Sequence, residues 1–544
     1  AHRLPVRPLV SRGQICHRAK GYMNPNVFVK CSTRISHRGR VLFSSSPSPI
    51  SHQHGTLRRL PEGTEEPATT PASPGLSVMV FGSGIYGEMC RGDYTGSKEP
   101  NPVPASLFQN SNLSTLPDDV YVTKVGAGWA NSYAVMSDSS VFMWGWTHDH
   151  RTSISCAMTY RRAPRLLRLL QRSSILGTLG FQSGLTRPKL LAGVDNVRDF
   201  ASGAGWSAAV SNDGQVFTVG DGFYGQLGHG VNTTFIETPL PIRSNNARAY
   251  GYENVGVKQV SCGFTHTLIL ANDGEVYSCG RLDCFAIGIG NPDDHFAENI
   301  LDVSTRPQSL SYWHQRLDRI NATPMGPVIK VSTGRNISAF LDNDGQVWTC
   351  GKNGSGALGT GNFVSQPFPV KLEGRFDGEK VVDIVCGHYH MAALTESGRL
   401  FTWGISNHGQ CGRPPRSGIL NPEAKANSFP DGRMAIYTHE PTHILPTLTG
   451  RAVFAGPHHT ALITDQGHCV VVGGSSTDAD AYLPKLPFGS KKINSIGFGL
   501  SHGVALSHDD GGVLPSTLND LNDGVKDELQ NRRQQGAFDH FIID

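Results

Sequence analysis

Three glycines near the start of the chain have the spacing of a nucleotide-binding turn. Gly82, Gly84 and Gly87 form a G-x-G-x-x-G pattern directly after the β-rich run 77–81. In a dinucleotide site such glycines close a strand-to-helix turn and direct the helix N-terminus at a pyrophosphate. Here residues 88–106 are interrupted by glycine and proline, so no helix can begin where a phosphate would need one. The spacing therefore does not predict a nucleotide site, and we expect no cofactor.

Four histidines, His266, His390, His459 and His502, share one position in copies of a repeated sequence. Equivalent positions in successive repeats lie too far apart to converge on one metal ion, so we expect buried histidines that hydrogen-bond the neighbouring repeat. The chain also lacks a P-loop, a nucleophile elbow and an H-E-x-x-H sequence, and its eleven cysteines form no C-x-x-C pair. We predict no metal site, no catalytic residue and no small-molecule substrate.

A repeat accounts for most of the chain. Six segments each place two glycines seventeen residues apart, as in CGFTHTLILANDGEVYSCG. Each segment reads as an apolar strand, a tight turn and a strand of aromatic and β-branched residues. The turn often contains an Asp-Gly pair such as Asp273-Gly274, which supplies the positive φ angles of a hairpin. The glycine pairs are Gly128 and Gly145, Gly203 and Gly220, Gly263 and Gly280, Gly334 and Gly351, Gly387 and Gly404, and Gly456 and Gly473.

Half-repeats at the two ends of the repeat region complement each other. Residues 77–88 match the second half of a repeat, with Gly82 and Gly87 at the glycine positions. Residues 498–514, which include His502, match a first half and stop after the turn. Such hairpins cannot bury themselves alone, but repeated around an axis they cover one another as propeller blades. We therefore expect the two half-repeats to pair and close the ring, which removes an exposed sheet edge.

The tandem pattern G-x-x-H…L…DG-x-V-[FYW]-x-x-G-x-x-x-x-G-x-L-G resembles that of the regulator of chromosome condensation family. The transit-like composition of residues 1–60 makes the chain most similar to the mitochondrial branch of that family. The resemblance implies an all-β fold, a seven-bladed β-propeller closed by N-terminal strands that complete the C-terminal blade. We expect the propeller to span 77–516, between a linker at 61–76 and a polar tail at 517–544. The G-x-L-G turn is missing after Gly145 and after Gly473, so those two blades are expected to be irregular.

Four tryptophans, Trp129, Trp206, Trp348 and Trp403, lie at hairpin positions. Photoreceptor members of the family use a tryptophan cluster on one surface, but the G-W-R-H-T motif that builds it is absent from this sequence. We therefore expect the four side chains to pack between blades.

Insertions between the blades are where we expect binding, because loops on a rigid propeller carry its binding surfaces. Insertion 151–191 contains the basic amphipathic segment 160–172. Two interpretations of this segment stay open: contact with ribosomal RNA, an acidic protein or anionic lipid, and a solvated helix that caps the propeller. In insertion 291–327 the sequence around Trp313 predicts a short helix that exposes this tryptophan. The composition of insertion 413–448 predicts a loop. The candidate partner-contact residues are Arg161, Arg162, Arg165, Arg168 and Trp313.

Charge is distributed unevenly along the chain. Residues 1–60 contain eleven of the 48 Lys and Arg residues and none of the 45 Asp and Glu residues, so the remainder, with 37 basic and 45 acidic residues, has a net charge of −8. An Arg-rich, Ser-rich, acid-free segment is typical of a mitochondrial or plastid transit sequence, and a basic nucleic-acid arm is the alternative. No apolar run reaches the roughly 18 residues of a membrane span, so we expect no transmembrane segment.

Family resemblance alone does not choose a function. The family includes nuclear exchange factors for a small GTPase, light receptors, ubiquitin-ligase modules and organelle factors. The transit-like segment favours a mitochondrial protein, in the matrix or at the inner membrane, that is a scaffold for protein partners in ribosome biogenesis or respiratory-complex assembly. A guanine-nucleotide exchange factor for an organelle GTPase of the inner-membrane fusion type is the second hypothesis. A nuclear chromatin-associated exchange factor is the third, and the acidic body disfavours it.

Overall fold

The computed structural model describes residues 76–108, 120–146, 184–229, 235–242, 256–281, 283–290, 313–320, 325–413, 437–474 and 481–508. The basic segment 1–60 and the tail 517–544 lie outside these residues, as do Arg161, Arg162, Arg165 and Arg168. The described part consists of strands, connecting turns and one 3-10 turn, η1 (Ala105–Leu107). Within it, no helix is long and apolar enough to cross a membrane.

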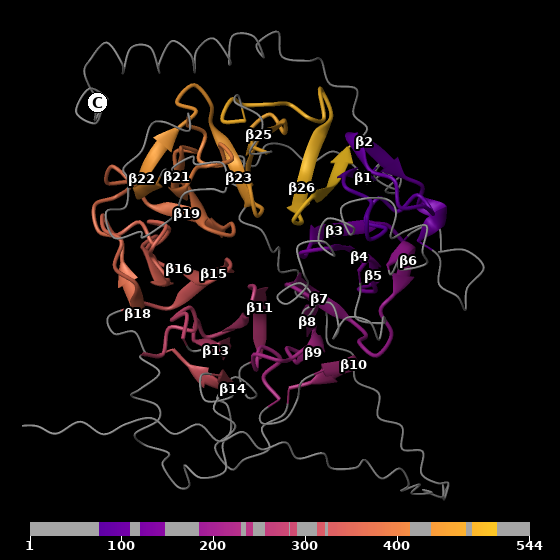
Figure 1. Ribbon diagram of the computed structural model, residues 1–544, viewed down its shortest axis with the longest axis horizontal. Helices are drawn as coiled ribbons and strands as arrows, with labels where there is room; N and C mark the ends of the chain where they lie inside the picture. Colours follow the sequence, from indigo (N-terminus) through magenta and orange to yellow (C-terminus); the bar gives the residue numbers. More distant parts are fainter. Residues whose placement is uncertain are drawn as a thin grey trace, which may run out of the picture. The chain divides into compact units, whose positions relative to one another are not determined.

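Seven antiparallel sheets surround a central axis, and each sheet is one blade (Figure 1). This is the all-β, seven-bladed propeller that the repeats predict. The closing blade contains β1 (Leu76–Gly82), β2 (Ser97–Val103), β26 (Lys492–Phe498) and β27 (His502–His508). The other blades, in chain order, contain β3 (Val122–Ala127), β4 (Asn131–Met136), β5 (Val141–Gly145) and β6 (Leu185–Leu190); β7 (Val197–Ser202), β8 (Trp206–Ser211), β9 (Val216–Asp221) and β10 (Phe235–Pro241); β11 (Val257–Cys262), β12 (His266–Ala271), β13 (Val276–Arg281) and β14 (Trp313–Arg319); β15 (Val328–Thr333), β16 (Ile337–Asp342), β17 (Val347–Gly351) and β18 (Gln366–Lys371); β19 (Val381–Cys386), β20 (His390–Thr395), β21 (Leu400–Ile405) and β22 (Tyr437–Ile444); and β23 (Gly450–Ala455), β24 (His459–Thr464) and β25 (Cys469–Gly473).

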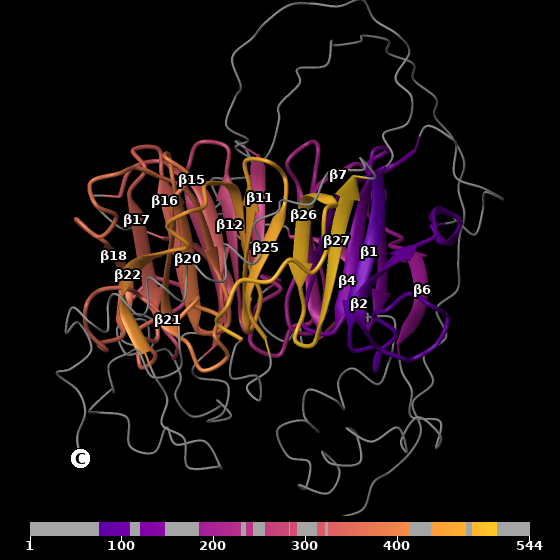
Figure 2. The ribbon, with the colours of Figure 1, turned by 90° about the horizontal axis from the view of Figure 1, so that it is seen from above.

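The ring is closed by pairing of the first and last described strands. The closing blade has the strand order β2-β1-β27-β26, and Figure 2 shows β27 between β26 and β1. The register of the β1–β27 pair runs from Leu76 opposite His508 to Gly82 opposite His502. The predicted completion of the C-terminal blade by N-terminal strands is thus confirmed. Gly82, Gly84 and Gly87 belong to β1 and the turn after it, and the described residues 88–104 that follow contain no helix.

The apolar core lies between neighbouring blades. Every residue of β4, β8, β12, β16 and β20, the second strand of five blades, is buried. One cluster joins Trp403 of β21 to Ala357 and Leu358 in the turn of the preceding blade. Each blade therefore has apolar side chains on both faces, which is why one hairpin alone cannot be stable and a closed set can.

A side-chain hydroxyl hydrogen-bonds the turn of each regular blade, that is, of the four blades between Val197 and Ile444. Two residues before the second repeat glycine, a Thr or Ser donates to a carbonyl in the G-x-L-G turn of its own blade. The bonds are Thr218 to Leu227 (2.8 Å), Ser278 to Ile287 (2.7 Å), Thr349 to Leu358 (2.8 Å) and Thr402 to Cys411 (2.9 Å). The two blades without the turn motif have Met143 and Val471 at that position. The closing blade makes the same turn after β1 but has Val80 at that position, so the hydroxyl is a feature of the four regular blades.

Two expectations require correction, one about an insertion and one about a blade. The segment around Trp313 is not a helix: residues 313–319 form β14, whose backbone pairs with β13 and completes that blade. The blade that contains Gly145 was expected to be irregular, but it has four strands because β6 supplies the fourth after the insertion. The blade of Gly473 has three strands among the described residues, as its missing motif suggested. Pairing to an open strand edge decided the first two cases, because it satisfies backbone groups that local sequence preference leaves out of account.

The second repeat glycine is expected to tolerate no side chain. At Gly404 the backbone has φ +107°, and a Cβ atom would lie 2.4 Å from the carbonyl oxygen of Tyr389. Gly404→Ala should lower the free energy of unfolding by at least about 3 kcal/mol, since strain and overlap act together. Gly374 is the matched control, with φ +65° and nothing within 4 Å of a Cβ, so Gly374→Ala should cost only about 1 kcal/mol. Urea unfolding of both variants measures the difference, and equal losses would contradict the prediction.

Candidate functional site

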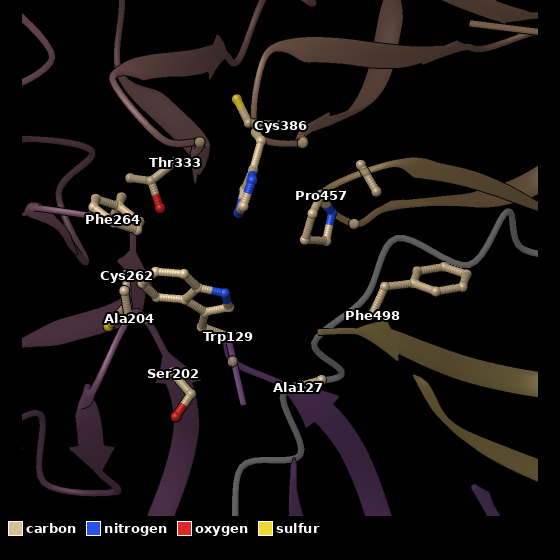
Figure 3. A pocket seen from close by; sticks show the side chains of 18 residues that line it. Ala127, Trp129, Ser202, Ala204, Cys262, Phe264, Thr333, Cys386, Pro457 and Phe498 are labelled. Atoms are coloured by element: carbon tan, nitrogen blue, oxygen red, sulfur yellow. The ribbon is translucent and has the colours of Figure 1, made fainter. Parts of the chain in front are cut away.

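The first glycines of the repeats form a ring at one end of the central channel. Each of them directly follows the innermost strand of its blade, and together they line a cavity of about 120 Å³ (Figure 3). A Cβ on Gly334, for example, would lie 2.3 Å from the carbonyl oxygen of Gly387 in the next blade. Gly499 closes the ring, since its Cβ would lie 2.8 Å from the carbonyl oxygen of Gly128. The lining glycines are Gly128, Gly203, Gly263, Gly334, Gly387 and Gly456.

Backbone hydrogen bonds between loops hold this ring in place. The residue after the glycine donates its N–H to a carbonyl of a following blade, as in Phe264 to Gly334 (3.3 Å) and Arg335 to His388 (3.2 Å). Leu500 of the closing blade donates to Trp129 at 2.8 Å. Glycine is required because neighbouring loops approach closely enough to make these bonds. The residues that follow the glycines are therefore presented from a rigid frame.

Aromatic residues and one arginine occupy the channel mouth. Figure 3 shows the indole of Trp129 extending into the cavity, and its ring centroid lies 4.9 Å from that of Phe264. The guanidinium of Arg335 lies over Phe264 at 4.9 Å and over Tyr389 at 5.3 Å. Arg335 Nη1 also donates to the Tyr389 hydroxyl. We call Trp129, Phe264, Arg335, His388 and Tyr389 the mouth cluster; all five are half-buried.

Histidines in and beside the mouth cluster are held neutral. The ring of His458 stacks on His408 at 4.0 Å and meets His388 edge-on at 5.9 Å. Burial lowers the pKa of His388 to about 3, with a contribution from the charge of Arg335, and burial with the neighbouring histidines lowers that of His458 to about 2. In the described part of the chain no group of His, Cys, Asp and Glu could hold a metal ion. Arg335 is thus the charged member of the mouth cluster at neutral pH.

The predicted repeat residues occupy two separate places. The second glycines do not line the cavity and are the last or next-to-last residue of the third strands: Gly145, Gly220, Gly280, Gly351, Gly404 and Gly473. Of the four repeated histidines, three hydrogen-bond a neighbouring blade as expected. His266 Nε2 bonds Ser338 Oγ (2.9 Å), His390 Nε2 bonds Thr460 Oγ1 (3.0 Å) and His502 Nε2 bonds the carbonyl of Asn131 (3.1 Å). His459 instead stacks on Phe498 at 5.1 Å.

The expectation that all four tryptophans pack between blades is wrong for Trp129. Trp206, Trp348 and Trp403 belong to clusters shared by adjacent blades, and Trp403 Nε1 donates to the carbonyl of Ala357. Trp129 follows its repeat glycine by one residue, whereas the others lie within strands. This offset places it in the loop at the channel mouth.

The mouth cluster was missed by sequence reasoning, which placed binding in the insertions. A signal was present: the residue after the first glycine differs in every repeat while the glycine does not vary. In successive repeats it is Trp129, Ala204, Phe264, Arg335, His388, Pro457 and Leu500. A variable position on a constant frame is typical of the binding surface of a repeat protein.

Comparison with protein families gives the same reading of the repeat. The model described as "Regulator of chromosome condensation (RCC1) repeat" matches residues 213–270 and 344–394, and a second RCC1-repeat model matches 257–284, 328–357 and 381–410. The chain contains RCC1 repeats within residues 213–284 and 328–410. These matches fall on the regular blades that keep both the Asp-Gly or Ser-Gly hairpin and the glycine turn.

Two curated relatives and one solved structure illustrate the range of RCC1-repeat proteins. The chain is 28% identical over 83% of its length to an Arabidopsis thaliana protein named "RCC1 domain-containing protein RUG3, mitochondrial", covering 90% of that protein. It is 24% identical over 63% of its length to the Mus musculus "Secretion-regulating guanine nucleotide exchange factor", covering 83% of it. The crystal structure of Prp20p from Saccharomyces cerevisiae, described with its binding to Gsp1p and histones, superposes with a TM-score of 0.55 at 15% identity, covering 85% of this chain and 96% of Prp20p. The last likeness shows the fold alone.

Proposed function

We propose that this RCC1-repeat protein is a mitochondrial scaffold that binds protein partners in ribosome biogenesis or respiratory-complex assembly, with the mouth cluster as its contact surface. The observation that carries the proposal is a Trp, a Tyr and an Arg fixed side by side on a rigid glycine ring. These three residue types are the ones enriched at the energetic centres of protein interfaces. A preformed frame also lowers the ordering cost of binding.

Two features support the mitochondrial part of the proposal. One is the acid-free basic segment 1–60, whose composition is that of a transit sequence. The other is the similarity over 83% of the chain to a relative named as mitochondrial. Fusing residues 1–76 to a fluorescent reporter tests it: we expect a mitochondrial signal, and a diffuse or nuclear signal would contradict the address.

The contact surface is tested by Trp129→Ala and Arg335→Ala in the full chain. Proximity labelling in mitochondria should recover the partners of the wild type, and each variant should reduce that recovery about tenfold or more, as hot-spot truncations do. Phe368→Ala is the matched control, because Phe368 is an exposed aromatic on the outer strand β18. The melting temperature of each variant is measured in parallel. Unchanged recovery in both mouth variants would contradict the assignment of this surface.

Guanine-nucleotide exchange is the second candidate function, and the name of the mouse relative favours testing it. In this case the propeller would accelerate release of labelled GDP from an organelle GTPase. The same two variants would slow that acceleration while the control would not. If GDP release from none of the organelle GTPases is accelerated, the exchange hypothesis is contradicted and the scaffold proposal stands alone. Contact of segment 160–172 with ribosomal RNA or anionic lipid, and a nuclear chromatin role, remain weaker proposals.

A further inference from the structure

The turn after β1 contains a buried carboxyl group where other blades have a neutral residue. Glu88 occupies the turn position that Gln226 and Gln410 occupy in two regular blades, and it makes the same bond. Its Oε2 accepts the N–H of Tyr86 at 2.7 Å, as the Gln226 amide oxygen accepts that of Tyr224 at 2.8 Å. The other two regular blades have Ala286 and Ala357 at this position, so the closing blade has a carboxyl group where the regular blades have an uncharged residue.

The second oxygen of Glu88 faces a histidine across the closing blade. Glu88 Oε1 lies 4.0 Å from Nδ1 of His502 on β27, and both side chains are fully buried. His502 Nε2 bonds the carbonyl of Asn131, an acceptor only, so Nε2 carries the proton and Nδ1 is an acceptor. Neither Glu88 Oε1 nor His502 Nδ1 has another hydrogen-bond partner in the described residues. The Oε1 atom of Glu88 and the Nδ1 atom of His502 are thus two hydrogen-bond acceptors that face each other in a buried site.

The 4.0 Å separation exceeds hydrogen-bond distance, and a movement of about 1 Å by either side chain would bring Oε1 and Nδ1 within it. A protonated Glu88 then donates from Oε1 to Nδ1 and links the turn after β1 to β27, while an ionised Glu88 leaves a buried charge opposite a lone pair. We propose that Glu88 and His502 share one proton across the ring closure and act as a latch, which strengthens the β1–β27 pairing when the proton is bound and weakens it when the proton is lost.

The surroundings of the latch agree with this. Burial raises the pKa of Glu88 to about 7 against the effect of backbone N–H groups, and burial lowers the pKa of His502 to about 4, so the shared proton resides on Glu88. Cys90 is the titratable residue in the same turn, and Arg187 on β6 acts on Cys90. Burial raises the pKa of the Cys90 thiol to about 12, which keeps it neutral.

The expected direction follows from where the proton is held. In the closed ring the carboxyl titrates near pH 7, and when β1 separates it titrates near its ordinary value of 4.5. Through this carboxyl the closed state binds more protons between these values, so the contribution of Glu88 makes the opening equilibrium rise with pH. For these two pKa values the latch adds about a tenfold increase in opening between pH 6 and pH 8.

Native-state hydrogen exchange of the full chain tests the latch with Glu88→Gln, which places in the closing blade the residue already found in two others. At each pH the ratio of wild-type to variant exchange rates cancels the intrinsic rate. For β1 and β27 amides that ratio should rise about tenfold from pH 6 to pH 8, and for β16 amides it should stay constant. A ratio for β1 that does not change with pH would overturn the proposal.

Two further variants keep the test specific to the closure. Ser77 and Ser507 lie directly opposite each other on β1 and β27, with hydroxyl oxygens 2.9 Å apart. A disulfide in the double variant Ser77→Cys, Ser507→Cys should abolish the pH-dependent rise while Glu88 is still present. Gln410→Glu puts a carboxyl at the same seat of another blade and should leave β1 exchange as in the wild type. The proposal would also be overturned if β1 exchange in the cross-linked chain still rose with pH, or if β1 exchange in Gln410→Glu differed from that of the wild type.

Discussion

Deleting residues 77–88 is expected to abolish cooperative folding of the full chain, which should then elute as aggregates. This is the largest effect that we expect. The deletion removes β1 and leaves the whole of β27 as an open edge beside an incomplete core. Val78, Met79 and Val80 are at most 4% exposed, and their burial alone contributes roughly 5–9 kcal/mol, which is comparable with the whole stability of an ordinary domain.

The two faces of β1 explain why the loss should spread around the ring. Val78 and Val80 pack in a cluster with the β3–β6 blade, whereas Met79 packs with the β23–β25 blade. Without β1, both neighbours expose apolar surface and β27 offers unpaired backbone groups to other chains. Size-exclusion chromatography and urea unfolding measure the outcome.

Point variants distinguish the loss of β1 packing from the effect of shortening the chain. Val80→Asp should unfold the closing blade, because a charge would be buried without a partner. Val364→Asp is its control, since Val364 is 59% exposed, and it should be nearly neutral. A synthetic peptide of residues 76–90 should restore soluble protein to the deleted chain by strand addition. A deleted chain that stays monomeric and unfolds cooperatively would show that closure by β1 is dispensable.

Acid destabilisation is the second large effect. Burial lowers the pKa of His266 and His390 to about 3 and that of His502 to about 4. The unfolded chain, whose histidines titrate near 6.5, therefore binds more protons below that pH, and the stability present above pH 6.5 is lost as pH falls. Between pH 7.5 and pH 5 each of the three costs about 2 kcal/mol.

Glu88 acts in the opposite direction. Because its pKa is raised to about 7, the folded state gains protons as pH falls from 7 toward 4.5. It offsets about 2 kcal/mol over the same range, so about 4 kcal/mol of destabilisation remains from these four groups. We therefore expect a clear fall in the urea midpoint from pH 7.5 to pH 5.

Variants at one histidine test this account. His390→Gln keeps an N–H donor near Thr460 but has no titrating ring, so its loss of stability between pH 7.5 and pH 5 should be about 2 kcal/mol smaller than that of the wild type. Thr460→Val removes the hydrogen bond and leaves the imidazole, so it should be less stable at both pH values with the wild-type difference intact. Equal pH dependence in His390→Gln and the wild type would contradict the account.

The fold was predictable because its determinants are local and repeated. The glycine interval, the hairpin turn and the alternation of apolar residues recur in six copies, so an error in one copy is outweighed by the others. Closure of the ring was predictable for the same reason, since residues 77–88 and 498–514 are complementary halves of a known unit. Where only one segment carried the signal, as around Trp313, the prediction of a helix was wrong and pairing with β13 decided the structure.

The sequence by itself determined the seven blades and the closure of the ring between the first and last half-repeats. It also determined that most of the repeated histidines are buried and hydrogen-bond a neighbouring blade. Tertiary structure alone decided which residues share a surface. Trp129, Phe264, Arg335 and Tyr389 come from four blades and meet because the first glycines let adjacent loops approach within bonding distance. Likewise Glu88 and His502 are more than 400 positions apart, and neither is unusual until β1 lies beside β27. A repeat specifies each unit through neighbours in sequence, whereas the channel mouth and the latch depend on distances between units that exist only once the ring has closed.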